Sequence, residues 1–247
     1  MISNGKFYES QFEEATIELL REAHWQYAFG DDIHRKYTDP LIEEDLRNFL
    51  AVQYKDKNLT TSEMDSIVAN LRNTGGQNDY YALRNTFLLY RDGYDFAYSD
   101  GRSNPFRLEY IDFEHPDHNI FRCVNQFVME QGRENRRPDI LLFINGIPVC
   151  IIELKNPTKQ NATIHDAHTQ ICTRYMRDIP ALLKYCALAV ISDGAKNALG
   201  ATYTPFEFFY EWKKIENEDK AGKGLDTLRT LIRGAISPER ILEILRD

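Results

Sequence analysis

The clearest pattern in the chain is two apolar runs, rich in β-branched residues, that flank the dipeptide Asn145-Gly146. They span residues 140–144 and 147–152. An Asn-Gly pair between two such runs predicts a β-hairpin. Because both runs are apolar at nearly every position, we expect strands covered on both faces, inside a mixed sheet flanked by helices.

The remaining periodicity predicts a helical N-terminal part followed by mixed structure. Thr60 and Glu63 have the spacing of a capping box at a helix start, and Thr163 can cap a helix that runs to about Arg177. The expected helices lie at residues 9–23, 40–54, 60–74, 79–89, 163–177 and 238–247. The expected further strands lie at 106–113, 119–130 and 188–192, the last closing the sheet, with loops at 157–161 and 216–224.

Charged residues stand at the open end of the predicted hairpin. Asp139 follows Pro138 before the first strand, and Glu153 and Lys155 end the second. Residues two apart on a strand share a face, so the Glu153 carboxylate and the Lys155 ammonium group meet at the rim of the sheet. The alternative is a rim salt bridge between Glu153 and Lys155, with Asp139 capping a strand.

The hairpin register decides whether the two acids meet. With a regular two-residue turn, Asp139 would face Ile152, and Glu153 would point to the other side of the sheet. One extra residue in the loop, or a bulge, makes Asp139 face Glu153. Because Pro148 has no N–H to donate, irregular pairing near the turn or an unpaired outer edge is expected. We therefore predict a loop or bulge longer than the tightest turn.

These residue types fit metal-dependent phosphodiester hydrolysis. Asp139, Glu153 and the carbonyl of Leu154 offer hard oxygen ligands to Mg²⁺, which can supply a nucleophilic water and offset charge on phosphate. Lys155 would stabilise the transition state or orient and deprotonate that water.

The motif formed by these residues resembles that of the PD-(D/E)xK nuclease superfamily. More of the chain is similar to the N-terminal nuclease domain of the type I restriction enzyme R subunit, so a restriction-endonuclease-like fold is expected. The residues that carry this similarity are Glu9, Glu13, Leu19, Leu20, Trp25, Tyr27, Gly30, Asn119, Phe121, Asn125, Gln126, Arg136, the run 137–155, Gln170, Tyr175, Pro180, Tyr185 and the run 191–194.

The resemblance implies a type I site-specific deoxyribonuclease that cuts double-stranded DNA with Mg²⁺ in the cytoplasm. An ATP-driven motor would first move the DNA past modification and specificity subunits. By position, Asp139 and Glu153 would be metal ligands and Lys155 the catalytic lysine. This chain has no GxxxxGK[ST] loop, so we infer a fragment that does not hydrolyse ATP. Residues 1–215 would form the nuclease domain, and 216–247 would lead toward the motor.

The family also has a Gln and Tyr motif, matched here by Gln170 and Tyr175. The familiar form has three residues between them, whereas this chain has four. On a regular helix, five positions turn about 140° past the start, so the two side chains would not share a face. Either a local irregularity realigns them, or they are an ordinary polar residue and a core aromatic residue.

Three further residues are weaker candidates for DNA binding or site support: Glu13, Gln126 and Arg137. Glu13 has an ordinary alternative as a solvated acid and Gln126 as an edge residue, whereas Arg137 is a basic group just before the site. Charge is the main objection to a nuclease, because the formal net charge of −8 gives no general attraction to DNA. This negative charge argues more strongly against a free-standing enzyme than against a domain to which partner subunits bring the DNA.

Composition narrows the remaining options. The 247 residues are 43% hydrophobic and 28% charged, which is ordinary for a globular protein, and no apolar stretch predicts a membrane span. The four cysteines form no CxxC pair and predict buried thiols, while His165 and His168 are expected at the surface. Two alternatives stay open: a non-cleaving DNA-binding or scaffold domain of the same fold, and a stand-alone repair nuclease or resolvase.

Overall fold

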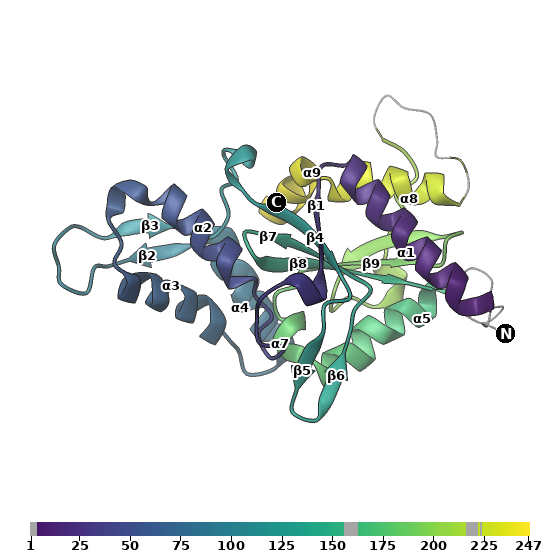
Figure 1. The fold of residues 1–247 in the computed structure, drawn as a ribbon, viewed down its shortest axis with the longest axis horizontal. Coiled ribbons are helices and arrows are strands. Elements are labelled where there is room, and N and C mark those ends of the chain that lie inside the picture. Colours follow the sequence, from purple (N-terminus) through teal and green to yellow (C-terminus); the bar gives the residue numbers. More distant parts are fainter. Residues whose placement is uncertain (1–3, 156–162, 216–221, 223) are drawn as a thin grey trace.

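The computed structural model describes residues 4–155, 163–215, 222 and 224–247. Its centre is a mixed sheet in the order β1 (Gln26–Phe29), β4 (Phe121–Asn125), β7 (Ile140–Ile144), β8 (Ile147–Leu154), β9 (Leu188–Ser192) and β10 (Asn197–Ala201). The pairs β1/β4 and β8/β9 are parallel, and the other neighbouring pairs are antiparallel. This is the mixed sheet flanked by helices that the apolar pattern predicts (Figure 1).

Helices cover both faces of this sheet. Figure 1 shows α1 (Asn4–Glu22), α8 (Leu225–Leu231) and α9 (Pro238–Arg246) along its upper side. The lower side carries α5 (Ile164–Thr169), the π-helix η4 (Gln170–Tyr175), α6 (Met176–Asp178) and α7 (Pro180–Leu183). Because both faces pack on helices, every residue of β7 and β8 is buried.

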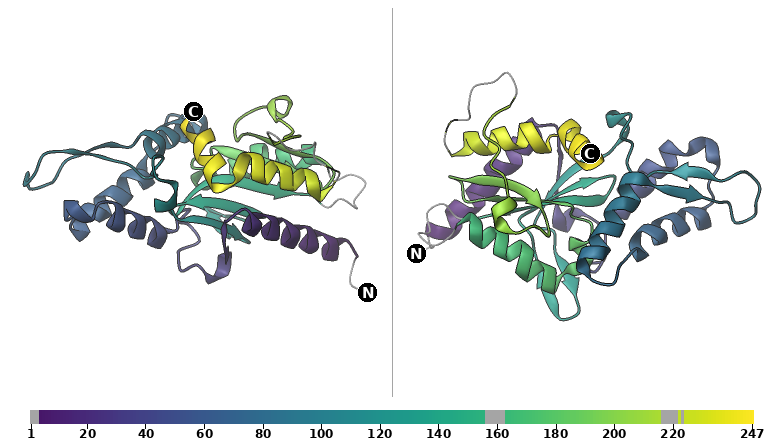
Figure 2. Two further views of the ribbon diagram at one scale, coloured as in Figure 1. Left: turned by 90° about the horizontal axis from the view of Figure 1, so that it is seen from above. Right: turned by 180° about the vertical axis from the view of Figure 1, so that it is seen from behind.

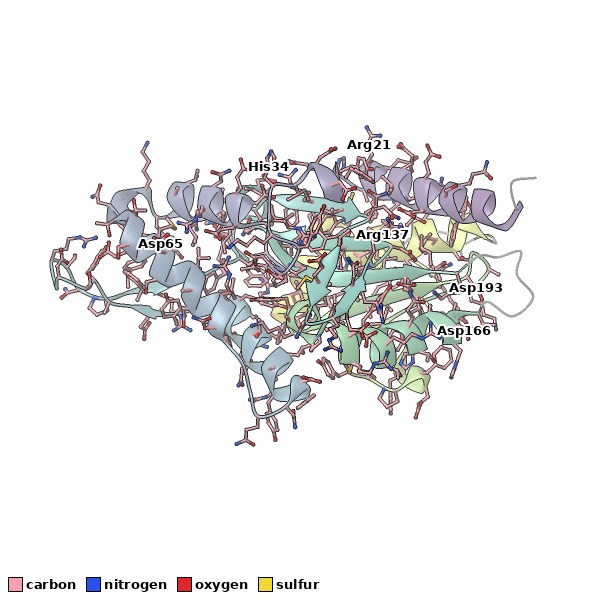
Figure 3. All side chains as sticks on the ribbon, turned by 60° about the horizontal axis from the view of Figure 1, so that its bottom comes forward. Arg21, His34, Asp65, Arg137, Asp166 and Asp193 are labelled. Atoms are coloured by element: carbon pink, nitrogen blue, oxygen red, sulfur yellow. The ribbon has the colours of Figure 1, made fainter. Side chains whose placement is uncertain are left out.

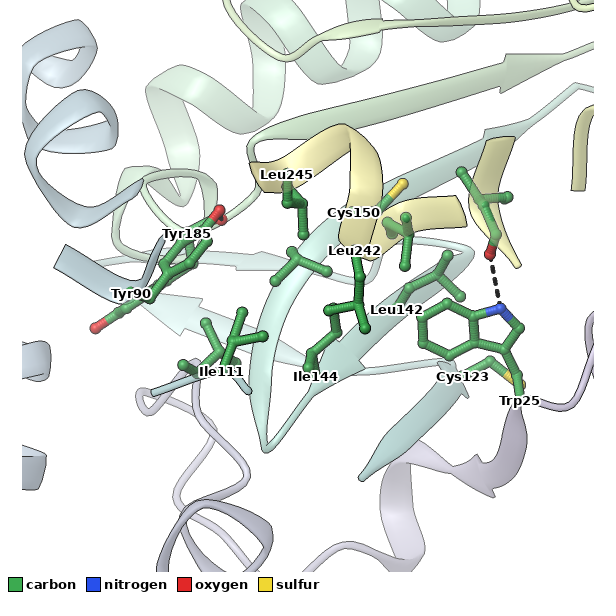
Figure 4. Close-up of a cluster of buried hydrophobic side chains, with 14 of the residues drawn as sticks. Trp25, Tyr90, Ile111, Cys123, Leu142, Ile144, Cys150, Tyr185, Leu242 and Leu245 are labelled. Atoms are coloured by element: carbon green, nitrogen blue, oxygen red, sulfur yellow. Dashed lines mark hydrogen bonds between the residues drawn. The ribbon is translucent and has the colours of Figure 1, made fainter. Parts of the chain in front are cut away.

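The upper face is closed by the C-terminal helices and Trp25. The Trp25 indole donates a hydrogen bond to the Ile236 carbonyl (2.8 Å), as Figure 4 shows, in a cluster that includes Leu142, Cys150 and Leu242. Ile236 ends a second π-helix, η6 (Ile232–Ile236). The segment after residue 224 is therefore packed against the same sheet that carries β7 and β8.

A helical lobe extends from one end of the sheet (Figures 1 and 2). It comprises α2 (Glu43–Gln53), α3 (Thr61–Asn73), α4 (Asp79–Asp92), β2 (Tyr94–Phe96) and β3 (Phe106–Leu108). Arg122 on β4 pairs with the buried carboxylate of Asp45 on α2 through two hydrogen bonds (2.7 and 2.8 Å). A buried, bidentate ion pair of this kind fixes orientation, so the lobe is held in one position on the sheet.

Short elements complete the described part of the chain. They are β5 (Met129–Gln131), β6 (Glu134–Arg136) and the 3₁₀ turns η1 (Gly30–Asp32), η2 (Lys55–Lys57), η3 (Pro116–His118) and η5 (Phe206–Phe208). Within the described residues, no helix combines the length and apolar character that crossing a membrane requires.

Several predicted elements are confirmed in place. The capping box at Thr60 is present, with Glu63 N donating to Thr60 Oγ1 and Thr60 N to the Glu63 carboxylate. A capping box at Thr163 starts the helix that ends at Asp178. The loops expected at 157–161 and, for the most part, 216–224 lie outside the described residues.

Other boundaries were wrong for identifiable reasons. The strand expected at 106–113 ends at Leu108, because the chain beyond it bonds to side chains such as that of Asn119. The strand expected at 119–130 breaks at Gln126, which has a positive φ of 55°. The helix expected from Pro40 begins at Glu43, since Ile42 N instead donates to Gly146 O (2.9 Å).

The strand at 188–192 does not close the sheet, because β10 lies outside it. The sequence pattern missed β10, β1 and α8. β10 has the sequence NALGA, which lacks β-branched residues, and β1 is four residues long, so neither gives a strong alternating signal.

Gly146 allows the hairpin turn to touch α2, and its replacement tests this contact. A Cβ at Gly146 would lie 2.1 Å from the Ile42 carbonyl oxygen, whereas a Cβ at Gly132 would meet no atom within 4 Å. Both glycines have positive φ, 75° and 62°, so both alanine variants carry left-handed strain of about 1–2 kcal/mol. We expect Gly146→Ala to lower the free energy of unfolding in urea by at least about 2 kcal/mol more than Gly132→Ala. Equal losses would contradict the contact.

Candidate active site at the open end of the β7–β8 hairpin

The hairpin contains a bulge that sets the position of the acids. Asn145 and Gly146 form a two-residue turn with φ of 51° and 75°, as a type I′ turn requires. Ile144 pairs with Ile147 and Phe143 with Pro148, but Leu142 pairs with Cys150, so Val149 has no partner on β7. The irregular pairing expected beside Pro148 is therefore present as a bulge, and the loop itself keeps its shortest length.

The bulge reverses which face the rest of β8 presents. Val149 and Cys150 are consecutive, yet both pack into the core on the α9 side. Beyond them, Ile151 packs on the α5 side, where Leu141 of β7 also lies. Because side chains alternate along a strand, Glu153 falls on the α5 side with Ile151, and Asp139 falls there with Leu141.

Asp139 and Glu153 are consequently neighbours at the open end of the hairpin. The Asp139 carboxylate accepts a hydrogen bond from the backbone N–H of Leu154 (2.7 Å). Burial, and next the negative charge of Asp139, raise the pKa of Glu153 to about 8. Glu153 is only 1% exposed, so water compensates little of its charge.

Four side chains form a closed ring of hydrogen bonds around Glu153. Lys155 Nζ donates to Glu153 Oε1 (2.8 Å) and to Gln170 Oε1 (2.7 Å). Gln170 Nε2 donates to the Tyr175 hydroxyl (2.7 Å), which donates to Glu153 Oε2 (3.3 Å). Burial and the charge of Glu153 raise the pKa of Tyr175 well above its usual range, so this hydroxyl stays protonated. The ring fixes the ammonium group of Lys155 beside the acids.

A π-helix aligns Gln170 with Tyr175. The helix that starts at Ile164 has a π segment at Gln170–Tyr175, in which hydrogen bonds join residues five apart. Residues at i and i+5 are then about one turn apart, which removes the mismatch expected for a regular helix. Of the two explanations that the sequence left open, the local irregularity is therefore the one present. The side chains of Gln170 and Tyr175 contact each other despite four intervening residues.

A second polar group lies beside Asp139. Glu13 of α1 accepts hydrogen bonds from Asn125 Nδ2 (2.7 Å) and Gln126 Nε2 (2.8 Å). Gln126 N also donates to the Asp139 carbonyl (3.3 Å), and Tyr27 OH donates to Asn125 Oδ1 (3.0 Å). The positive φ of Gln126 is a strained conformation that directs its amide to Glu13. Glu13 and Gln126 therefore lie next to the site. The contact between Tyr27 and Asn125 was not predicted from the sequence.

The arginines before Pro138 differ in their surroundings. Arg136 forms salt bridges with the carboxylates of Asp178 and Glu134, with N–O distances of 2.6 Å each, so its positive charge is compensated. Arg137 is exposed, and Figure 3 shows it at the surface near the strand ends, far from Asp65 in the helical lobe. Of these two arginines, Arg137 is the exposed one, two residues before Asp139.

The histidines at 165 and 168 do not form a metal cluster among the described residues. His165 is exposed, and His168 is half-buried with its Nε2 3.0 Å from the Thr204 carbonyl. Three of the four cysteines are buried, and Cys172 is half-buried. These groups lie outside the ring around Glu153.

The raised pKa of Glu153 predicts a pH-dependent gain from Glu153→Gln. In metal-free buffer the unfolded chain loses this proton near the ordinary value of 4.5, but the folded chain keeps it to about 8. The contribution of Glu153 to the free energy of unfolding is therefore fully present below pH 4.5 and falls by about 1.4 kcal/mol per pH unit as pH rises toward 8. The glutamine cannot ionise, so the unfolding free energy of the variant should exceed that of the native protein at pH 8 by more than at pH 5. Exposed Glu207→Gln is the control; a gap independent of pH would contradict the burial argument.

Comparison with known proteins identifies relatives of this chain. Residues 6–208 match the family model described as type I restriction enzyme R protein N terminus. The type I restriction enzyme HindI endonuclease subunit of Haemophilus influenzae is 31% identical over 96% of this chain and 23% of its own length. A protein of Methanocaldococcus jannaschii, also named as a type I restriction enzyme endonuclease subunit (MjaIXP), is 28% identical over 95% of this chain and 25% of its own. The chain thus spans about a quarter of the length of these relatives, and it belongs to the family of type I restriction enzyme R protein N-terminal regions.

Proposed function

We propose that this chain is the nuclease part of a type I restriction enzyme R subunit and cuts double-stranded DNA by Mg²⁺-dependent phosphodiester hydrolysis. The observation that carries the proposal is the convergence of Asp139, Glu153 and Lys155 at one strand end. The family membership and the names of the relatives support the same activity. The arrangement matches the PD-(D/E)xK pattern that the sequence resembles.

Asp139, Glu153 and the Leu154 carbonyl would hold the metal ion. The donor set fits Mg²⁺, because all three groups are hard oxygen ligands. The fit is also electrostatic. Burial and the charge of Asp139 hold the pKa of Glu153 high, and a bound cation would offset the repulsion between the two carboxylates. When bound, Mg²⁺ lowers the pKa of a water ligand and offsets phosphate charge.

Lys155 would face the phosphate with its position already set. Glu153 and Gln170 each accept one of its hydrogen bonds, and an ammonium group has three hydrogens to donate. The remaining hydrogen can contact a phosphate oxygen or the attacking water. Lys155 is therefore the proposed catalytic residue, and Gln170 and Tyr175 are positioning residues that act through it.

Glu13 and Gln126 would support the metal side of the site through Asp139, and Arg137 would contact the DNA backbone. A net charge of −8 predicts weak binding of free DNA. We therefore propose that DNA reaches the site through an ATP-driven motor and through modification and specificity subunits, none of which this chain supplies. The nuclease domain would comprise residues 1–215 together with the helices after residue 224, which pack on the same sheet, and it would work in a cytoplasmic complex.

Three substitutions separate metal binding from catalysis. Asp139→Ala should weaken Mg²⁺ binding to the 247-residue chain more than tenfold in calorimetry, because it removes a ligand. Lys155→Ala should leave Mg²⁺ binding intact but lower DNA cleavage by the assembled enzyme at least about 100-fold, as expected for a lost transition-state donor. Asp65→Ala, which alters an exposed ion pair with Arg47, is the control for both.

Two outcomes would reject the assignment. Unchanged Mg²⁺ binding in Asp139→Ala would remove the metal site, and a non-cleaving scaffold would then be the better explanation. Cleavage that survives Lys155→Ala would remove the catalytic role of the lysine, whatever the metal result.

A further inference from the structure

A second cluster of ligand-type side chains lies in the loop between β3 and β4. Within the described residues, Asp112, His115 and His118 bring one carboxylate oxygen and two ring nitrogens within 4.8 Å of one another. The loop stands beside the C-terminal helix α9 (Figures 1 and 2). The spacing Asp-x₂-His-x₂-His was visible in the sequence but carries little weight without the fold.

The 3₁₀ turn η3 brings the two histidines together. His118 N donates to the His115 carbonyl (3.0 Å), and in a 3₁₀ turn side chains three apart eclipse each other. The two imidazole rings accordingly stack, with centroids 4.8 Å apart and planes 22° from parallel. Both direct Nδ1 at Asp112 Oδ2, at 3.3 Å for His115 and 2.9 Å for His118.

The Asp112 carboxylate has more donors around it than it can accept. Oδ1 accepts the backbone N–H groups of Glu114 and His115 (3.0 and 2.8 Å). Oδ2 accepts Gln53 Nε2 (3.0 Å) and also faces both imidazole nitrogens. A carboxylate offers about four lone-pair sites, so five neighbours leave at least one ring nitrogen without a place to donate. A nitrogen that instead turns its lone pair toward this oxygen is repelled unless a cation lies between them.

The backbone of the cluster is fixed before any ion binds. Asn119 accepts a hydrogen bond from Asp112 N (2.9 Å) and donates to Asp112 O (2.7 Å), and Asn145 of the hairpin turn donates to Asn119 (2.8 Å). Both asparagines are buried. Asp112 is itself 3% exposed, whereas the side chains of His115 and His118 are 66% and 52% exposed. An ion could therefore enter from solvent onto a buried, immobile carboxylate.

We propose that Asp112, His115 and His118 form a Zn²⁺ site. Zn²⁺ bonds of about 2.0–2.2 Å to nitrogen and oxygen place tetrahedral ligands about 3.3 Å apart, close to the two observed separations. Two imidazoles favour Zn²⁺ over Mg²⁺. The segment 109–118 also has four carboxylate residues and no lysine or arginine, so its charge favours a cation. With three protein ligands, the fourth position is left to water.

This site is separate from the nuclease centre. It is linked to Asn145 at the turn of the hairpin, whereas Asp139 lies six residues away at the open end. At roughly 3.3 Å per residue, the two ends are on the order of 20 Å apart. Zn²⁺ would cross-link residues of this loop without touching Lys155 or Glu153, and its test does not depend on DNA cleavage.

Calorimetric titration of the chelator-treated 247-residue chain with Zn²⁺, in excess Mg²⁺, tests the site. We expect one Zn²⁺ per chain and a rise in Tm on binding. His115→Ala and His118→Ala should each weaken Zn²⁺ binding at least tenfold, and because both side chains are exposed, these variants should fold. His34→Ala, an exposed histidine elsewhere, and Asp139→Ala at the nuclease site should bind Zn²⁺ as the native chain does.

Other results would overturn the site. Zn²⁺ binding that persists unchanged in both histidine variants, or that is lost in Asp139→Ala, would place the ion elsewhere. Absence of binding at micromolar Zn²⁺ would leave Asp112 as a hydrogen-bonded loop anchor only.

Discussion

The unpaired Val149 on β8 determines on which face of the sheet Glu153 and Lys155 lie. Up to Pro148 the hairpin is regular, and without the extra residue Glu153 would lie among the apolar side chains under α9. A charge buried there, away from Gln170 and Tyr175, would cost several kcal/mol. One inserted residue instead places Glu153 opposite Asp139 and beside the helix that supplies the other partners. The strand irregularity thus determines the geometry of the candidate site at this end of the hairpin.

The site contains more negative charge than its own side chains compensate. Glu13, Asp139 and Glu153 meet near one end of the sheet, and Lys155 is the cation that contacts Glu153 there. The closed ring restrains this lysine, while burial holds the pKa of Glu153 near 8. A protein that keeps such a group at a cost in stability does so commonly at a functional site. The formal net charge of −8 is compatible with the proposed delivery of DNA by other subunits.

Strong local signals made much of this structure predictable. The Asn-Gly hairpin, the capping box at Thr60 and the acid-lysine spacing each rest on a few adjacent residues, and each of these elements appears in place. The edge strands β1 and β10 were missed because short or Ala- and Gly-containing segments become strands only when a neighbour pairs with them. The contact of Tyr27 with Asn125 joins residues 98 apart in sequence, which periodicity cannot reveal. Periodicity also cannot reveal that His115 and His118 meet beside Asp112, because a 3₁₀ turn brings them together.

The π-helix has a consequence for the helix as a whole. An extra residue in a regular helix rotates everything after it by about 100°, which would carry Asp178 away from Arg136. The wide turn at Gln170–Tyr175 absorbs that rotation, so both ends of the helix stay in phase with the sheet, and Arg136 still reaches Asp178 at 2.7 Å. The helix therefore tolerates an insertion without a change in the fold around it. A length change of one residue can in this way be confined to a single turn.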